Sequence, residues 1–92
     1  MPLVDAETLQ RELRRLQGWE RGERDIAKTY RFRDFKEAIA FVNEVAHVAE
    51  ARNHHPNILI QYDRVTLTLW THDEGGVTER DLALAAECDA LL

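Results

Sequence analysis

The sequence predicts an α+β domain in which three helices pack on one face of a four-stranded antiparallel sheet, in the order α-β-β-α-β-β-α. Apolar residues repeat at helical spacing near both ends and in the middle of the chain. Between these segments lie two stretches of alternating polarity, each interrupted by a turn signal as in a hairpin. Two hairpins separated by a helix favour one antiparallel sheet with helices on one side, because such a sheet can leave its other face in water.

The first predicted helix spans residues 6–17. Asp5 is a suitable N-cap, and Val4 and Leu9 are spaced for a hydrophobic staple at this end. Leucines then repeat at helical spacing, at Leu9, Leu13 and Leu16. Gly18 ends the helix, because glycine readily leaves the helical conformation.

The first predicted hairpin begins at Trp19. A turn signal around residues 21–23 interrupts the segment, and apolar residues alternate with polar ones after it. The residues expected on the buried side are Ile26, Tyr30 and Phe32. The pattern therefore predicts two antiparallel strands joined by a tight turn.

The second predicted helix spans residues 35–51. Asp34 and Glu37 form a variant of the capping box at its start. Its expected apolar stripe contains Phe35, Ala38, Ile39, Val42, Val45, Ala46 and Ala49. Pro56 disfavours the helical conformation at His55, so the chain must leave the helix near this histidine and the one before it. The histidine pair therefore stands at a helix exit.

A second hairpin is predicted from strands at residues 58–62 and 65–70, joined across Asp63 and Arg64. The residues of the second strand expected to face the helices are Val65, Leu67 and Leu69, and those expected on the open face are Thr66, Thr68 and Trp70. Continued alternation would place His72 on the open face as well.

The last predicted helix begins with Thr78 as N-cap and with Asp81 at the third position of a capping box. Val77 and Leu82 are spaced for a hydrophobic staple. The expected buried stripe consists of Leu84, Cys88 and Leu91.

Composition limits the classes of function. The chain fits one domain, residues 1–92, because no linker-like segment divides it. Its formal net charge is −5 and its basic residues are scattered among acids, so we expect no direct binding of nucleic acid. No apolar run approaches the roughly 18 residues of a membrane span, and the N-terminus lacks the pattern of a signal peptide. We therefore expect no membrane association and a cytoplasmic location. Cys88 is the only cysteine, which excludes an intrachain disulfide.

Clustered histidines indicate acid-base chemistry, because an imidazole can give or accept a proton near neutral pH. Three of the four histidines fall in two places, at His54, His55 and His72. They could also be ligands of a zinc ion. However, adjacent histidines usually diverge too far to bind one tetrahedral ion, and no carboxylate or thiolate completes an obvious set. We therefore expect no metal.

The segment from Glu50 to Asp81 reads E-x3-H-H-P, then a hairpin, then T-H-x4-V-T-E-R-D. In order and spacing it closely resembles the pterin-4a-carbinolamine dehydratase family. Trp19, within Gly18-Trp19, is similar to the N-terminal tryptophan of that family, so the resemblance covers nearly the whole chain. The fold that it implies, a four-stranded antiparallel sheet with three helices on one side, agrees with the element order above.

The resemblance implies that the chain is a hydro-lyase removing water from 4a-hydroxytetrahydrobiopterin or a related pterin, giving a quinonoid dihydropterin. No metal or redox cofactor is implied. His54 and His72 would transfer the protons and could exchange acid and base duties, while His55 would bind and orient the pterin. Asp81 would hold a histidine in its useful tautomer. Glu50, Pro56 and Trp19 are the substrate-binding residues that the resemblance implies, with Trp19 as a wall beside the ring.

Alternatives remain open at two of these positions and for the function as a whole. Asp81 could serve only as the capping partner of Thr78. Trp19 could be ordinary core. A non-catalytic dimerisation or binding module of the same fold is the alternative function, although a scaffold has no need to keep three histidines together. Dehydration of a 4a-hydroxypterin distinguishes the two functions.

Self-association is also expected, as a homodimer or homotetramer. A domain of this size buries a limited core, and the family that it resembles forms dimers or tetramers. Phe41 and Val48 lie off the expected stripe of the second helix, so a partner helix would be needed to cover them.

Overall fold

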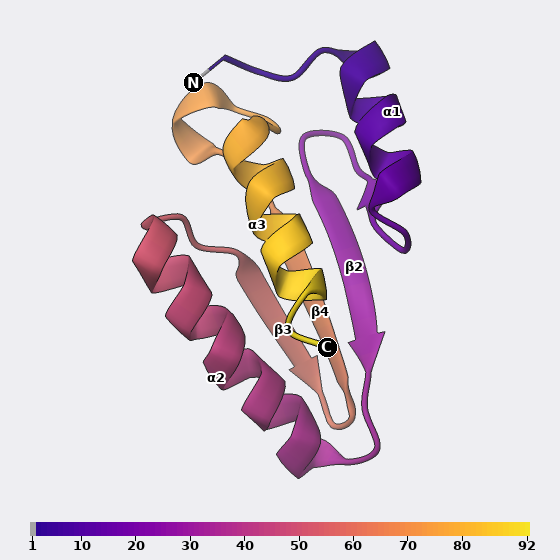
Figure 1. The fold of residues 1–92 in the computed structure, drawn as a ribbon, viewed down its shortest axis with the longest axis vertical. Coiled ribbons are helices and arrows are strands. Elements are labelled where there is room, and N and C mark those ends of the chain that lie inside the picture. Colours follow the sequence, from indigo (N-terminus) through magenta and orange to yellow (C-terminus); the bar gives the residue numbers. More distant parts are fainter. Residues whose placement is uncertain (1) are drawn as a thin grey trace.

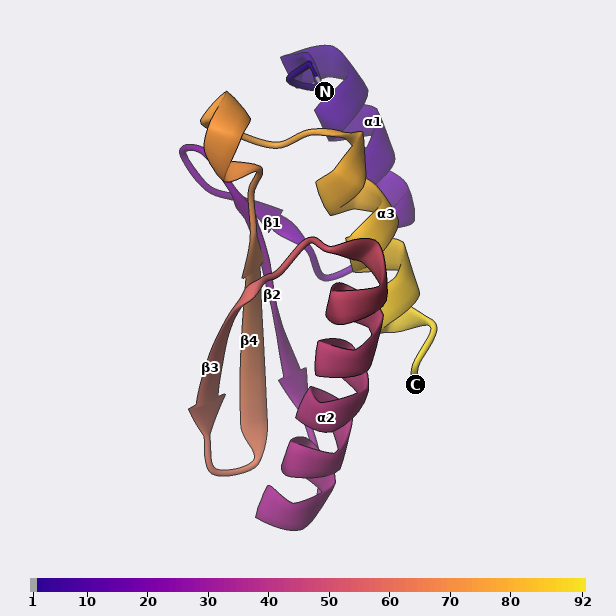
Figure 2. The ribbon, with the colours of Figure 1, turned by 90° about the vertical axis from the view of Figure 1, so that its left-hand side faces the viewer.

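Three helices cover one face of a four-stranded antiparallel sheet in the computed structural model, which describes residues 2–92 (Figures 1 and 2). The α-helices are α1 (Ala6–Arg15), α2 (Phe35–Arg52) and α3 (Glu79–Asp89), and a short 3-10 helix, η1, spans His72–Glu74. The strands are β1 (Glu20–Arg21), β2 (Ile26–Arg31), β3 (Asn57–Gln61) and β4 (Arg64–Leu69). Figure 2 shows the sheet on one side and all three α-helices on the other. The predicted fold class and element order are confirmed.

The strand order in the sheet is β1-β2-β4-β3, so β4 lies between β2 and β3. Leu67 of β4 pairs with Lys28 of β2 and with Ile58 of β3. β3 therefore forms one edge of the sheet. The long helix α2 connects β2 to this edge, so the chain crosses the helical face before it enters the second hairpin (Figure 1).

The core lies between the sheet and the helices. Its fully enclosed members include Ile26, Val45, Val65, Leu67, Leu69, Leu84 and Cys88. The opposite face of the sheet is polar, and Thr29 and Thr66 share a hydrogen bond across β2 and β4 there, with 2.8 Å between their hydroxyl oxygens. The strands thus follow the predicted pattern of a half-buried sheet.

All three predicted N-caps are present. Asp5 accepts a hydrogen bond from the Thr8 backbone amide, and this bond lowers the pKa of the Asp5 carboxyl. Asp34 caps α2 in the same way, and the capping box of Thr78 with Asp81 begins α3. The first helix ends at Arg15, two residues before the predicted end at 17, and the second ends at Arg52 instead of 51.

The predicted apolar stripe of the second helix is confirmed at Ala38, Val45 and Ala49, and it is wrong at Phe35 and Ala46 and in leaving out Phe41. The buried residues of α2 are Ala38, Phe41, Val45 and Ala49, whereas Ala46 is exposed and Phe35 is 49% exposed. Phe41 packs in the core of its own chain, with its ring centroid 4.6 Å from that of Tyr30. It therefore needs no partner helix. The sequence contains two overlapping apolar stripes, and the sheet buries the one that contains Phe41 and leaves Phe35 exposed.

The second hairpin turns one residue earlier than predicted, across Tyr62 and Asp63, because Arg64 already belongs to β4. Tyr62 adopts a positive φ of 56° at this turn. Its exposed ring stacks on Phe35 at the start of α2, with 6.5 Å between centroids and an interplanar angle of 11°. The hairpin tip and the first turn of α2 are therefore in contact.

None of the helices within residues 2–92 is long and apolar enough to cross a membrane.

Candidate active site

His54 is positioned by the way α2 ends. The next residue after the helix, Asn53, adopts the left-handed conformation at φ 51° and ψ 42°. Asparagine is one of the few residues that tolerate this conformation, which turns the chain sharply. The backbone amide of His54 then donates to the carbonyl of Ala49 at 3.1 Å, which holds the residue back against the helix it has just left. As a result, the His54 side chain is buried.

His54 meets Asp81, whose side chain has no exposed surface. Nε2 of His54 lies 2.5 Å from Oδ1 of Asp81. The other carboxylate oxygen, Oδ2, accepts the Thr71 hydroxyl at 2.9 Å and the Thr78 backbone amide at 2.8 Å. Thr78 also shares a hydrogen bond with Thr71, at 2.6 Å between hydroxyl oxygens. Asp81 therefore completes the capping box and contacts a histidine at the same time.

This contact fixes which nitrogen of His54 carries a hydrogen. An ionised carboxylate only accepts hydrogen bonds, so Nε2 must be the donor to Asp81. Nδ1 makes no hydrogen bond within residues 2–92, and no enclosed side-chain nitrogen or oxygen of those residues lacks a partner. Nδ1 must therefore reach solvent. A neutral His54 presents the lone pair of Nδ1 to a proton donor, and Asp81 stabilises the imidazolium that forms when it accepts the proton.

His55 is exposed, in contrast to His54, and pairs with Glu50 one helical turn earlier. Its Nε2 lies 2.5 Å from Oε2 of Glu50. Pro56 follows it and is half-buried at the start of β3. Glu50 thus belongs to the surroundings of the site by holding the ring of His55.

The prediction that His72 lies on a strand is wrong, because β4 ends at Leu69 and His72 begins the 3-10 helix η1. The amide of Thr71 donates to the carbonyl of Gly76 at 2.8 Å, which closes a short loop after the strand. Burial still alternates through this segment, with Thr71 buried and His72 exposed as the alternation predicts. His72 lies on this loop with its side chain exposed.

All three histidines nevertheless line one cavity of about 240 Å³. Its full lining consists of Asn53, His54, His55, Trp70, Thr71, His72, Asp73 and Arg80. The guanidinium of Arg80 donates to the carbonyl of Asn53 at 3.0 Å, which fastens the start of α3 to the exit of α2. Trp70, Thr71 and Arg80 are site residues that the sequence reasoning missed. The segment Thr78-Glu79-Arg80-Asp81 was the signal that could have indicated Arg80.

Trp19 does not join this site. It is 4% exposed in the core, and its indole Nε1 donates to Oδ2 of Asp89 at 3.1 Å. Asp89 lies about two turns along α3 from Asp81, at the far end of the helix. Lys28 and the hydroxyl of Tyr30 also bind Asp89, so this carboxylate joins β2, α3 and the segment after α1. Of the two expectations for Trp19, the structure of this chain agrees with the core residue.

Burial, and secondly the hydrogen bond to Asp89, raise the pKa of the Tyr30 phenol above its ordinary range. Burial also raises the pKa of the Cys88 thiol to about 12. Both groups are therefore inert at neutral pH, and neither adds acid-base or nucleophilic chemistry to the site.

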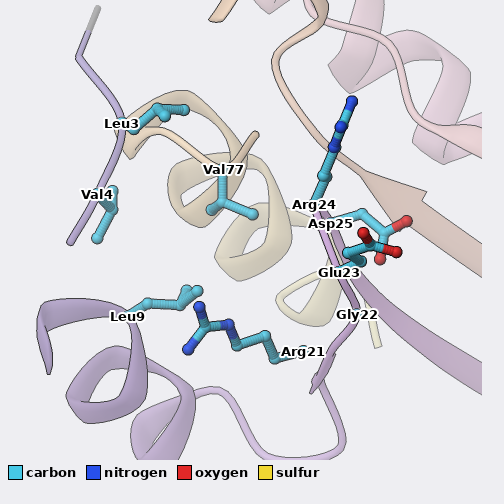
Figure 3. Close-up of a pocket in the computed structure, with 9 residues that line it drawn as sticks. All are labelled: Leu3, Val4, Leu9, Arg21, Gly22, Glu23, Arg24, Asp25 and Val77. Atoms are coloured by element: carbon cyan, nitrogen blue, oxygen red, sulfur yellow. The ribbon is translucent and has the colours of Figure 1, made fainter. Parts of the chain in front are cut away.

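Two further observations limit the chemistry of the chain. Among residues 2–92, no group of three or more His, Cys, Asp or Glu side chains is placed to hold a metal ion. A separate cavity of about 130 Å³ lies between the N-terminal segment, α1 and the β1–β2 turn, and its lining includes Leu3, Val4, Leu9, Arg21 and Val77 (Figure 3). Its lining contains no histidine, whereas three histidines line the cavity beside His54; this histidine cavity is therefore the candidate active site.

Comparison with known proteins shows which proteins this chain is similar to. The family model described as "Pterin 4 alpha carbinolamine dehydratase" matches residues 2–91. A Thermomicrobium roseum protein named "Putative pterin-4-alpha-carbinolamine dehydratase" is 51% identical over 85 residues, covering 92% of this chain and 91% of that protein. A Sulfurisphaera tokodaii protein of the same name is 41% identical over 92 residues, covering 100% of this chain and 99% of that protein.

Two solved structures are similar as well. One, described as a transcriptional coactivator/pterin dehydratase from Brucella melitensis, has a TM-score of 0.93 and 36% identity, and 97% of each chain is covered. The other is described as a pterin dehydratase-like protein identified as a RuBisCO assembly factor in the alpha-carboxysome. It has a TM-score of 0.70 and 28% identity, covering 82% of this chain and 89% of that one.

Proposed function

This chain belongs to the pterin-4a-carbinolamine dehydratase family, and from this membership we propose that it removes water from a 4a-hydroxytetrahydropterin such as 4a-hydroxytetrahydrobiopterin. The product is the quinonoid dihydropterin. In this elimination a base takes the proton from ring N5, the electrons of that bond form the N5–C4a double bond, and the C4a–O bond breaks. An acid protonates the departing hydroxyl, which leaves as water.

The observation that carries the proposal is the buried His54–Asp81 pair, which opens through Nδ1 of His54 on a cavity that also contains His72. Two proton-transfer groups beside one cavity are what the elimination requires. We assign the N5 proton to His54, because Asp81 stabilises the positive charge that His54 gains. His72 protonates the leaving hydroxyl. Substrates with the hydroxyl on the opposite ring face would exchange these duties.

The remaining residues of the site bind and orient the ring. His55 is held by Glu50 and lines the cavity, so it supplies a fixed donor or acceptor to the polar edge of the pterin. Pro56 stiffens the chain directly after it. Asp81 acts through His54 and is a positioning residue. None of these roles draws on a metal or redox cofactor, and the absence of both from the reaction is part of the proposal.

The test is a direct assay of dehydration. Purified protein is added to an aromatic amino acid hydroxylase that generates the 4a-hydroxypterin in place, and the formation of quinonoid dihydropterin is followed by absorbance. We expect the rate to rise in proportion to the concentration of this protein, above the spontaneous rate. Dehydration at the spontaneous rate throughout would refute the proposal.

A binding function without catalysis is the second candidate, because the similar structure at TM-score 0.70 is described as an assembly factor. The same assay distinguishes the two, since a pure binding module leaves the spontaneous rate unchanged. The cytoplasmic location remains a prediction, and a role in recycling tetrahydrobiopterin is part of this proposal.

We also propose that the chain self-associates, through a surface other than the one expected from its sequence. Phe41 is buried within its own chain and is not available to a partner. The exposed edge of the sheet is β3, where Leu59 is 54% and Ile60 is 38% exposed. An unpaired strand edge with apolar side chains is a template for pairing with a second copy. A dimer or tetramer built on this edge is the proposed assembly.

A further inference from the structure

A second cavity adjoins the histidine cavity and shares part of its wall. It has a volume of about 390 Å³ and is lined by Arg24, Asp25, Trp70, His72 and Gly75. Trp70 and His72 line both cavities. The histidine cavity alone, at about 240 Å³, is smaller than the roughly 300–1,000 Å³ of most ligand sites. A ligand that occupies the first cavity therefore has the second one beside it for any substituent it carries.

Arg24 is brought to this cavity by the turn between β1 and β2. The turn packs beside the loop that carries His72, since a Cβ atom on Gly76 would stand 4.0 Å from the Arg24 carbonyl oxygen. Figure 3 shows that Arg21, the last residue of β1, and Arg24, in the turn after it, point in different directions. Arg21 extends toward Leu9, whereas Arg24 extends away from Arg21, and Arg24 lines the small cavity as well as the second one.

The exposed guanidinium of Arg24 makes no ion pair or side-chain hydrogen bond with any of residues 2–92. Asp25 lines the same cavity, and its carboxylate lies over the backbone of the turn, where its Oδ1 would stand 2.1 Å from a Cβ on Gly22. The guanidinium of Arg24 is therefore available to a ligand at this cavity.

We propose that this second cavity binds the substituent of the pterin ring and that Arg24 selects substituents carrying a negative charge. The inference rests on the proposed function, because it takes the ring to lie in the histidine cavity. A guanidinium binds a carboxylate or a phosphate ester through two parallel hydrogen bonds, and an uncharged hydroxyalkyl chain cannot reproduce that contact. Trp70 and His72 belong to the walls of both cavities, so they would contact both the ring and its substituent.

The experiment compares kcat/KM for three carbinolamines, with a neutral dihydroxypropyl, a carboxylated or a phosphorylated substituent. The variants are Arg24→Gln and, as matched control, Arg21→Gln, which removes the same charge from the same hairpin. Wild-type protein is expected to favour the anionic substrates by about tenfold at low ionic strength, as for one charge-assisted contact. Arg24→Gln is expected to abolish this preference through KM, Arg24→Lys to restore part of it, and Arg21→Gln to retain it. The two anionic substrates show which anion is bound better.

The possible outcomes separate the inference from the proposed function. A wild-type preference near one, or an Arg24→Gln variant that keeps the preference, would overturn the inference. An equal loss in both variants would assign the effect to overall charge and would overturn it as well. If no carbinolamine is dehydrated, the proposed function fails, and calorimetric titration with the unreactive pterin-6-carboxylate and 6-hydroxymethylpterin tests the cavity independently. Tighter binding of the carboxylate in wild type and Arg21→Gln, but not in Arg24→Gln, would support the anion site without catalysis.

Discussion

Nε2 of His54 lies 2.5 Å from Oδ1 of Asp81, and both side chains are buried at the junction of α2 and α3. The carboxylate receives two further hydrogen bonds, from Thr71 and Thr78, so its position does not depend on the histidine. The histidine therefore takes its orientation from a carboxylate that the fold has already placed.

Asp81→Asn is expected to lower kcat by roughly 10²–10⁴, because the amide can donate to Nε2 and so favours the wrong tautomer of His54. The alkaline and acid limbs of the pH–rate profile should shift with it, which a purely structural role would not cause. Glu79→Gln is the matched control, since it removes a carboxylate from the same first turn at an exposed position. An Asp81→Asn variant that folds and keeps the wild-type kcat and pH profile would refute the positioning role.

His54→Ala and His72→Ala are each expected to reduce turnover by roughly 10²–10⁴, the effect of losing one proton-transfer group. The two losses should differ between the two 4a-hydroxy epimers, because the histidines exchange duties between ring faces. His47→Ala, an exposed position on α2 outside the cavity, is the control and should retain full activity. Wild-type turnover in both folded site variants would show that the assignment is wrong.

Treatment with EDTA is expected to leave dehydration intact, and metal analysis of the purified protein should find no stoichiometric zinc or iron. The reason is that proton transfer by imidazoles needs no Lewis acid. Activity that disappears on chelation and returns with one added metal would contradict this expectation.

Leu59→Lys is expected to convert the self-associated protein to a monomer at micromolar concentration, because a lysine on an edge strand opposes pairing with another copy. Sedimentation equilibrium measures the mass. Phe41→Glu cannot serve this purpose, since it would place a charge in the core and unfold the chain. A monomeric wild type would refute self-association, and an oligomeric Leu59→Lys variant would exclude the β3 edge as the contact.

Stability is expected to fall at alkaline pH in two stages. The folded chain raises the pKa of the Cys88 thiol from 9.0 and that of the Tyr30 phenol from 10.0, so each protonated group stabilises the folded state fully below those values. As pH rises above them, the free energy of unfolding declines by about 1.4 kcal/mol per pH unit for each group. In Tyr30→Phe the free energy of unfolding should still decline above pH 9.0, because Cys88 is retained. Its decline should not become steeper above pH 10.0, because the phenol is absent.

Urea unfolding between pH 8 and pH 11 measures this dependence. Tyr62→Phe is the control, because its ring is 67% exposed at the hairpin tip, and it should follow the wild-type curve. Identical curves for Tyr30→Phe and the wild type would show that Tyr30 does not cause the second stage.

The parts of the fold that were predictable are those set by neighbouring residues. The caps at Asp5, Asp34 and Thr78 each involve partners within three residues, so their patterns can be read directly from the sequence. The inward face of α2 depended on a sheet far along the chain, and the apolar positions alone allowed two choices. Packing of Phe41 against Tyr30 decided between them.

The histidines of the site could be predicted from the sequence, but the residues that hold them in place could not. His72 was assigned to a strand because the alternation of buried and exposed residues continues past the end of β4, whereas the hydrogen bond from Thr71 to Gly76 makes this segment a loop. The contact between His54 and Asp81 joins residues that are 27 positions apart. No local sequence pattern predicts the contact between His54 and Asp81 or the hydrogen bond from Thr71 to Asp81. The role of Asp81 was expected only from the family resemblance.

The Thr71–Gly76 bridge closes a loop that carries His72 but not His54. The two proposed catalytic histidines therefore differ in how easily evolution can replace them. His54 is interlocked with Asp81 and Thr71, so a different residue there would disturb the core around it. His72 projects from a clamped loop into solvent, and its side chain supports no other part of the fold. A lineage could therefore exchange the residue at this loop, and with it the reaction, while it inherits the rest of the scaffold unchanged.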